Sequence, residues 1–271
     1  MKAIHKQLLA GLLAAGLSVG CQTVSTTQGG SVGVQRSQMM MVSADEIEQA
    51  SSKQYEEMLA EARKEKTLDR DAAMLKRVRG IVGRLTPHSA VFRADAPAWA
   101  WEVHVFQSDE LNAWCMAGGK MAIYSGLIQR LKLSDDEIAA VMGHEIAHAL
   151  REHARERVSK SMATGIGLSV AGALLGIGQA GQDLMGAVAQ VTFELPNSRE
   201  HETEADRIGV ELAARAGYDP RAAVTLWDKM AAESAGAPPQ WLSTHPSHST
   251  RQRDLATYAE RVMPLYQAAR R

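Results

Sequence analysis

The stretch HEIAH at residues 144–148 places two histidines four positions apart, with a glutamate beside the first. In an α-helix this offset puts His144 and His148 on one face, one turn apart, so both imidazoles can reach one ion. Ser134 and Glu137 form a capping-box pattern ahead of the stretch, which predicts where such a helix begins. The chain must therefore fold so that another segment completes a site around this helix.

A second polar segment, PNSREHETEADRIG, supplies candidates for that completion. Glu202 and Asp206 are four apart and share one face of a predicted helix that ends near Gly217. Two histidines and one carboxylate are the open ligand set of hydrolytic zinc sites, which leaves one position for water. We predict one Zn²⁺ per chain, held by His144, His148 and Glu202, with Asp206 orienting a ligating imidazole.

Glu145 lies where such a site needs a base. It is predicted to accept a proton from water and to return it to the leaving nitrogen of a peptide. Four other polar residues of the second segment point to other faces of its helix. They are expected to form a solvated charge cluster: Glu200, His201, Glu204 and Arg207.

The period of the hydrophobic pattern changes along the chain. Helical spacing predicts helices over residues 43–66, 69–85, 220–233 and 249–271. In the middle, WEVHVF, LNAWCM and KMAIYSGL indicate short strands, interrupted by a glycine pair. We predict an α+β, mainly helical fold with a small antiparallel sheet, whose exposed edge could accept an extended peptide.

HEIAH followed by ETEAD resembles the HExxH and ExxAD pair of gluzincin metallopeptidases related to HtpX and the CAAX prenyl proteases. The pattern is similar in particular to the exported BepA-, LoiP- and Oma-like branch, and the resemblance covers roughly residues 70–260. It implies a zincin-type metalloprotease domain with the sheet beside the HExxH helix. NAWCMAGGKMAIYSGLI resembles the strand segment of this family, although Trp114 and Ala117 stand where phenylalanine and proline are common.

The segment LSTHPSHS resembles a loop of the same family, in which a histidine can occupy the fourth zinc position as a reversible plug. The corresponding residue is His245. As a fourth ligand it would displace the catalytic water and hold the enzyme latent, and as a neighbour it would stabilise the oxyanion or cap the loop. Pro246 and the preceding GAPPQ favour a mobile loop and hence the switch. Asn112 and Arg251 are candidate substrate contacts.

The amino-terminal sequence predicts export. MKAIHKQ is a short basic start and thirteen apolar residues follow, which together indicate a signal peptide over 1–20. LSVGC resembles the lipobox of bacterial lipoproteins, and this implies that Cys21 is acylated and holds the protein on the periplasmic face of the outer membrane. A plain cleaved signal or an uncleaved anchor are the alternatives. Polar, glycine-rich residues predict a flexible tether over 21–42, followed by the zinc metallopeptidase domain over 43–271.

The charge balance and the cysteine content each argue against one class of function. With 30 basic and 31 acidic residues, the net charge of -1 gives no electrostatic reason for a nucleic-acid partner. If Cys21 carries lipid, Cys115 is the one remaining thiol, and its apolar neighbours favour a buried side chain over a nucleophile.

The resemblance implies a periplasmic, membrane-tethered zinc endopeptidase in envelope or outer-membrane protein quality control. Unfolded or misassembled envelope proteins are the expected substrates, and the outer-membrane assembly machinery is a candidate partner. The alternative is a zinc-stabilised chaperone-like or binding lipoprotein with little peptidase activity. Such a protein would keep the ligands but would not need Glu145.

Overall fold

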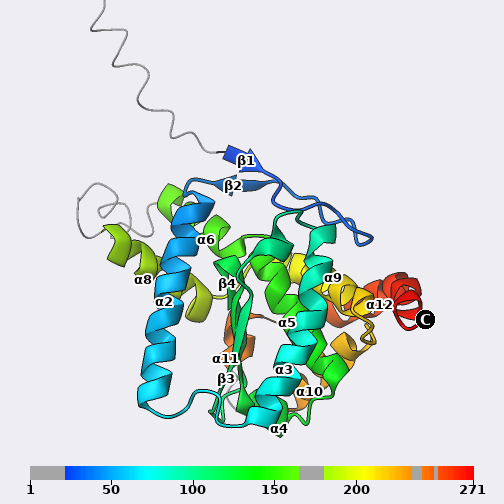
Figure 1. The fold of residues 1–271 in the computed structure, drawn as a ribbon. Helices are drawn as coiled ribbons and strands as arrows, with labels where there is room; N and C mark the ends of the chain where they lie inside the picture. The colour runs from blue at the N-terminus through cyan, green and yellow to red at the C-terminus, as the bar shows by residue number, and fades with distance from the viewer. Residues whose placement is uncertain (1–21, 165–179, 234–239, 247–249) are drawn as a thin grey trace, which may run out of the picture.

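Helix α5 (Asp135–Leu150) lies at the centre of the molecule, surrounded by other helices and a small sheet (Figure 1). All of its residues from Glu137 onward are buried. The Ser134 hydroxyl accepts a hydrogen bond from the Glu137 N–H, and the Glu137 carboxylate accepts one from the Ser134 N–H. The predicted capping box is confirmed, and it fixes the start of the helix that carries HEIAH.

The computed structural model describes residues 22–164, 180–233, 240–246 and 250–271. Its other helices are α2 (Ala44–Lys64), α3 (Ala72–Leu85), α4 (Ser125–Arg130), α6 (His153–Thr164), α8 (Ala180–Phe193), α9 (Arg199–Arg215), α10 (Ala222–Glu233), α11 (Gln240–Thr244) and α12 (Arg251–Ala269). Its strands are β1 (Gln22–Val24), β2 (Gln38–Met40), β3 (Glu102–Phe106), β4 (Ala113–Met116) and β5 (Lys120–Tyr124). In these described ranges no helix is both long and apolar enough to cross a bilayer.

The three central strands lie in the order β3, β5, β4. β4 and β5 form an antiparallel hairpin, and its turn contains Gly118 and Gly119 with φ of 75° and 81°, a conformation that favours glycine. β5 pairs with β3 in parallel. The expected α+β class is confirmed, but the sheet is mixed and not antiparallel throughout. The reason is that the chain passes from β3 to the far edge of the sheet, where it forms β4. The hairpin then brings β5 back between β4 and β3.

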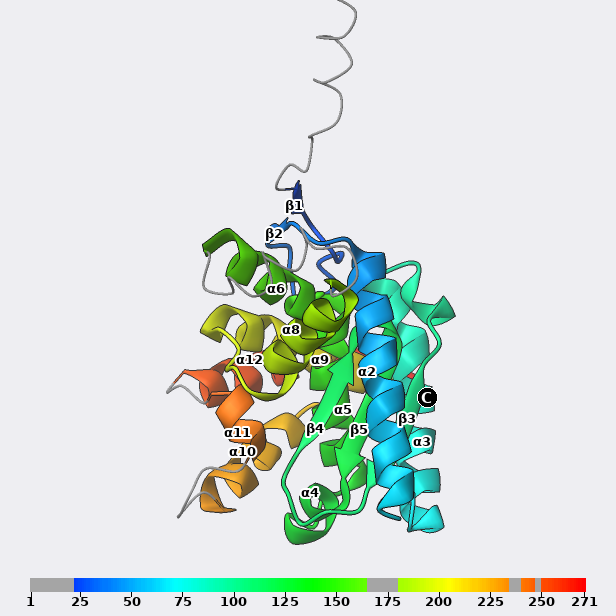
Figure 2. The same ribbon diagram turned by 90° about the vertical axis from the view of Figure 1, so that its left-hand side faces the viewer.

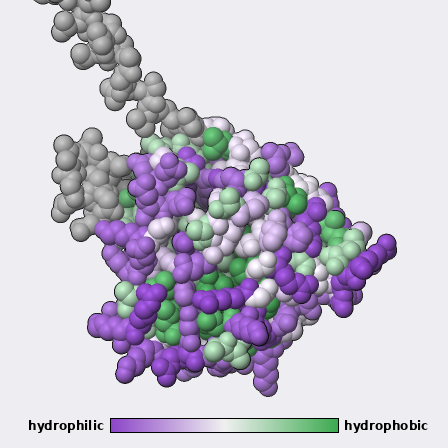
Figure 3. Space-filling view, viewed as in Figure 1, coloured by the Kyte–Doolittle hydropathy of each residue, from purple (hydrophilic) through white to green (hydrophobic). Residues whose placement is uncertain are grey.

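The sheet separates two layers of helices. On one face α2 packs along the strands, where Tyr55 and Leu59 belong to the same buried cluster as Trp114. The Tyr55 hydroxyl also donates a hydrogen bond to the Met121 carbonyl of β5 (3.2 Å). Figure 2 shows α2 along this face, while α3 and α5 belong to the main core. Polar and charged side chains cover much of the molecular face in Figure 3.

Helices α5 and α9 cross at a point where two glycines meet. A Cβ added at Gly209 would lie 2.7 Å from the backbone nitrogen of His144, and one added at Gly143 would lie 2.9 Å from the Gly209 carbonyl oxygen. Both distances are shorter than ordinary van der Waals contact, so the crossing requires glycine on each helix. This close approach brings the histidine face of α5 against the first turns of α9, which carry Glu202.

Residues 22–42, named here the amino-terminal strap, lie against the domain and do not form the expected flexible tether. β1 pairs with β2, Val32 is buried in the main core, and the Gln38 amide donates to the Arg151 carbonyl oxygen (2.6 Å). The tether prediction is wrong for these residues because their few apolar and charged side chains find partners far away in the sequence, which local composition does not reveal. Cys21 and the predicted signal peptide lie outside the described residues.

Candidate metal centre

Four side chains from three segments converge at the α5–α9 crossing. His144, His148, Glu202 and His245 each offer one ligand atom, and these atoms lie within 4.8 Å of one another. The Nε2 atoms of His144 and His148 are 3.0 Å apart, and the Glu202 carboxylate oxygens lie 3.4 and 3.5 Å from them. All four residues are buried.

These distances can be tested against a tetrahedral zinc site. Zinc bonds of about 2.0–2.1 Å to nitrogen and oxygen place neighbouring ligand atoms roughly 3.3 Å apart. The observed separations of 3.0 to 3.5 Å agree with that spacing. Two buried imidazole nitrogens that face one carboxylate also form a donor set typical of zinc. The residues present therefore fit a zinc ion.

The outer groups hold two of these ligands in place. Nδ1 of His144 lies 2.9 Å from Oδ1 of Asp206, so the second ring nitrogen is directed at the centre. Arg251 contacts both carboxylates from beneath, with Nη1 2.7 Å from Glu202 Oε2 and Nε 2.6 Å from Asp206 Oδ2. Burial opposes ionisation of Glu202, but His245 and Arg251 hold its pKa well below the usual range.

The structure buries Arg251 against the predicted ligands. Its side chain is 1% exposed and is paired with the two carboxylates, so the substrate contact stays a prediction that this geometry does not support. Asn112 is also buried at the start of β4, where its side-chain oxygen accepts the Ala113 N–H (2.9 Å). Neither role was visible in the sequence, because both depend on segments that meet only in the folded chain.

Glu145 lies beside the ligand group and faces the open cleft. Trp241 of α11 donates its indole N–H to Glu145 Oε1 (2.8 Å), and His245 Nε2 lies 3.5 Å from the same oxygen. Burial raises the pKa of Glu145 to about 7, which suits a group that accepts and returns a proton near neutral pH. Sequence reasoning missed Trp241. Its position four residues before His245 was the available signal.

His245 is held with one ring nitrogen turned away from the centre. Nδ1 lies 3.0 Å from both the Trp241 carbonyl oxygen and the Thr244 hydroxyl. The ring also stacks on Trp241, with centroids 4.8 Å apart. Nε2 therefore remains on the side of the ligand cluster, and the structure brings His245 together with the three ligands predicted from the motifs.

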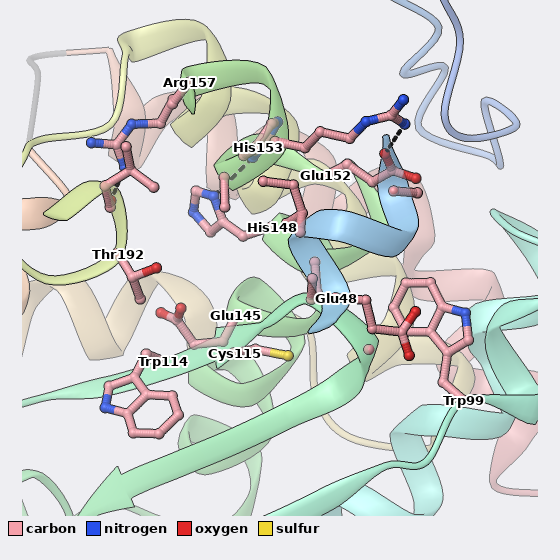
Figure 4. Close-up of a pocket in the computed structure, with 18 of the residues that line it drawn as sticks. Glu48, Trp99, Trp114, Cys115, Glu145, His148, Glu152, His153, Arg157 and Thr192 are labelled. Atoms are coloured by element: carbon pink, nitrogen blue, oxygen red, sulfur yellow. Dashed lines mark hydrogen bonds and ion pairs between the residues drawn. The ribbon is translucent and has the colours of Figure 1, made fainter. Parts of the chain in front are cut away.

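The cleft in front of these residues lies between α2, α6, α8 and β4. Glu145 and His148 face the same cavity (Figure 4), and Trp114 and Cys115 of β4 form one wall. Cys115 is a buried free thiol, as predicted, and burial raises its pKa well above the usual value. A buried thiol with a raised pKa is typical of a structural cysteine and not of a nucleophile.

The charge cluster predicted as solvated is partly buried. His201 and Glu204 are 1% and 6% exposed, and Glu204 pairs with Arg151 and His153. The prediction is wrong for these two residues because α6 and the amino-terminal strap cover their face of α9. No pattern in the sequence indicated that His153, five residues after His148, reaches Glu204.

Comparison with known proteins agrees with this geometry. Residues 76–259 match Peptidase family M48. The chain is 32% identical over 243 residues to Metalloendopeptidase OMA1, mitochondrial, of Bos taurus, covering 84% of this chain and 45% of that protein. It is 38% identical over 157 residues to Mitochondrial metalloendopeptidase OMA1 of Arabidopsis thaliana, covering 58% and 31%.

A bacterial protein is also similar to this chain. The Beta-barrel assembly-enhancing protease of Escherichia coli (strain K12) is 28% identical over 205 residues, covering 72% of this chain and 41% of that protein. The chain spans less than half the length of these curated relatives. The relationship predicted from HEIAH and ETEAD, and the metalloendopeptidase class that it implies, are confirmed.

Proposed function

Because this chain belongs to Peptidase family M48, we propose that it is a zinc-dependent endopeptidase in the quality control of bacterial envelope proteins. The observation that carries the proposal is Glu145. This buried carboxylate lies beside a ligand group of histidines and one glutamate, and it lines the cleft. A zinc ion that only stabilised the fold would not need this base.

The residues around the cleft suit peptide hydrolysis. Bound zinc would supply a Lewis acid that polarises the peptide carbonyl and makes water more acidic. Glu145 accepts the proton of the attacking water and passes it to the leaving nitrogen. The Trp241 N–H holds the Glu145 carboxylate in one orientation, and Asp206 fixes His144.

An extended polypeptide fits the cleft because β4 is the outer strand of the sheet and lines one wall. In the part of the chain that the structure describes, the outer edge of β4 pairs with no other strand. This edge can pair with a substrate segment, so the backbone and not a particular side chain provides most of the recognition. Unfolded or misassembled proteins expose such segments. They are therefore the proposed substrates.

We also propose that His245 holds the protein latent. Its Nε2 stands on the side of the ligand group, where it can fill the position that water needs. Opening requires the His245 ring to leave the ligand group while Trp241, on which it stacks, keeps its hydrogen bond to Glu145. A partner or substrate that displaces His245 would activate the enzyme.

The proposed location rests on the amino-terminal sequence. The basic start, the apolar run and Cys21 support export and lipid attachment at the periplasmic face of the outer membrane. Similarity to a Beta-barrel assembly-enhancing protease supports the outer-membrane assembly machinery as a partner. A Cys21→Ser variant is expected to leave the membrane fraction when the protein is expressed in a bacterium. Unchanged membrane association would reject the lipid anchor.

The first test compares zinc content and casein degradation for the wild type, Glu145→Gln and His245→Ala. Zinc in all three, with activity lost in Glu145→Gln and raised in His245→Ala, supports the latent peptidase. Zinc without cleavage in any variant favours the zinc-stabilised binding lipoprotein. Equal and measurable activity of Glu145→Gln and wild type would reject the assignment of the base.

A further inference from the structure

His144 and His148 are oriented by different groups. His144 has the Asp206 carboxylate directly behind it. Behind His148 there is a second imidazole instead, because His148 Nδ1 lies 2.8 Å from Nδ1 of His153. Nε2 of His153 in turn lies 3.0 Å from Glu204 Oε2. The carboxylate that orients His148 is therefore one residue further away.

The direction of these hydrogen bonds follows from ligation. When Nε2 of His148 binds a metal, the proton of that imidazole must be on Nδ1. The Nδ1–H then donates to Nδ1 of His153, which leaves the His153 proton on Nε2 to be donated to Glu204. Each nitrogen in this series of hydrogen bonds is either a donor or an acceptor, and the two imidazoles can form both bonds only in these tautomers.

Two arginines hold the far end of this chain. Arg151 Nε lies 3.0 Å from Glu204 Oε2, and Arg36 Nε lies 2.8 Å from Glu204 Oε1. Arg36 also places its two terminal nitrogens 2.7 Å from the two oxygens of Glu156. Glu156 and Arg151 are fully buried, so their charges need partners within the protein, and Lys160 also contributes to Glu156. Arg36 comes from the amino-terminal strap.

We infer that His153 and Glu204 are positioning residues for His148, and that Arg36 of the amino-terminal strap locks them in place. This inference rests on the proposed function, since it takes the four-residue cluster as a zinc site. The strap is then a part of the metal centre and not only a connection to Cys21. When Arg36 is lost, Glu204 and His153 gain freedom, the His148 ring can rotate, and the site binds zinc more weakly.

The experiment measures zinc affinity of the purified full-length protein by competition with a coloured chelator. It also records the visible spectrum of the cobalt-substituted protein and the thermal unfolding of the metal-free form. Arg36→Ala is expected to weaken zinc binding by about 10-fold, which is the lower end of the range for groups that orient a metal ligand. It is also expected to alter the cobalt spectrum. Arg36→Lys, which keeps the charge but not the fork, replaces it if Arg36→Ala does not fold.

Arg155→Ala is the matched control. Arg155 also fastens the strap, since its Nε donates to the Val42 carbonyl oxygen (2.6 Å), but its ion pair is with Glu152 and not with Glu204. Its zinc affinity and cobalt spectrum are expected to equal those of the wild type. An equal loss in Arg155→Ala and Arg36→Ala would overturn the specific role of Arg36.

Two variants of His153 separate positioning from packing. His153→Gln keeps one acceptor and one donor and should retain most of the zinc affinity, whereas His153→Leu should lose about 10- to 100-fold. If His153→Leu only lowers the unfolding temperature of the metal-free protein, with zinc affinity and cobalt spectrum unchanged, the inference is rejected. If both the wild type and His245→Ala bind zinc in this His153-dependent way but degrade no casein, the peptidase proposal is rejected while the inference is supported.

Discussion

Replacement of Gly209 by alanine tests whether the close α5–α9 crossing builds the metal centre. The added Cβ would lie 2.7 Å from the backbone nitrogen of His144, and ordinary contact begins at 3.4 Å. The helices must therefore separate by about 0.7 Å at that point. Metal sites accept changes of only about 0.2 Å in ligand distances. The same substitution that crowds the crossing should therefore move Glu202 out of position.

The matched control is Gly80→Ala in α3, where an added Cβ meets nothing within 4 Å. Alanine in a helix interior stabilises the folded protein by about 1 kcal/mol relative to glycine, so the control should be more stable than the wild type. Overpacking at Gly209 costs about 1–3 kcal/mol. Since about 1 kcal/mol corresponds to 2–4 °C in a protein of this size, Gly209→Ala should unfold roughly 2–12 °C below Gly80→Ala.

The assay is thermal unfolding by circular dichroism, with zinc affinity measured by chelator competition on both variants. Gly209→Ala should lose stability relative to the control and also bind zinc more weakly. The reasoning is refuted if Gly209→Ala matches Gly80→Ala in both measurements. It would also fail if stability fell while zinc affinity stayed at the wild-type value, because the crossing would then not set the ligand geometry.

Three further predictions concern single side chains. Ser134→Ala should lower the free energy of unfolding by about 1 kcal/mol in urea titrations, because α5 loses its cap; no change would mean that packing alone fixes the helix start. Asp206→Asn should reduce zinc affinity about 10- to 100-fold in chelator competition, since the carboxylate orients a ligating ring; an unchanged value would place Asp206 outside the centre. Burial opposes ionisation of Glu137, but Lys229 holds its pKa below the unfolded value of 4.5, so its contribution to stability is present above that pH and is lost as pH falls. Glu137→Gln should therefore show a shallower loss of stability between pH 5 and pH 3 in urea titrations, and an equal slope would contradict this linkage.

The motifs allowed much of the site to be predicted because their spacing acts through a single helix. His144, Glu145 and His148 occupy consecutive turns of α5, and a helix fixes their relative directions without help from the rest of the chain. The same holds for Glu202 and Asp206 on α9. The capping box predicted at Ser134 was local as well and is present, and the structure has a second one at Ser43.

The groups that sequence reasoning missed depend on contacts between distant segments. Arg251 was taken for a substrate contact, yet it neutralises two acidic residues under the metal centre. Trp241 orients the base, and His153 connects a ligand to Glu204. A polar residue has many possible partners in a sequence of this length. Only the fold selects one.

The amino-terminal strap shows the same limit on a larger scale. Its composition is typical of a tether, but Val32 and Arg36 find an apolar core and two buried carboxylates on elements more than a hundred residues away. Whether a weakly apolar segment is ordered depends on the surface available to it, and local sequence carries no record of that surface.

The sequence by itself determined the chemistry of this protein, since the identity and spacing of His144, Glu145, His148 and Glu202 fix which atoms can bind a metal and which can move a proton. The tertiary structure decided how those atoms meet. Facing glycines set the distance between α5 and α9, and the mixed sheet puts β4 along the cleft. Helical spacing acts over a few ångströms, whereas the separation of two helices depends on every side chain packed between them.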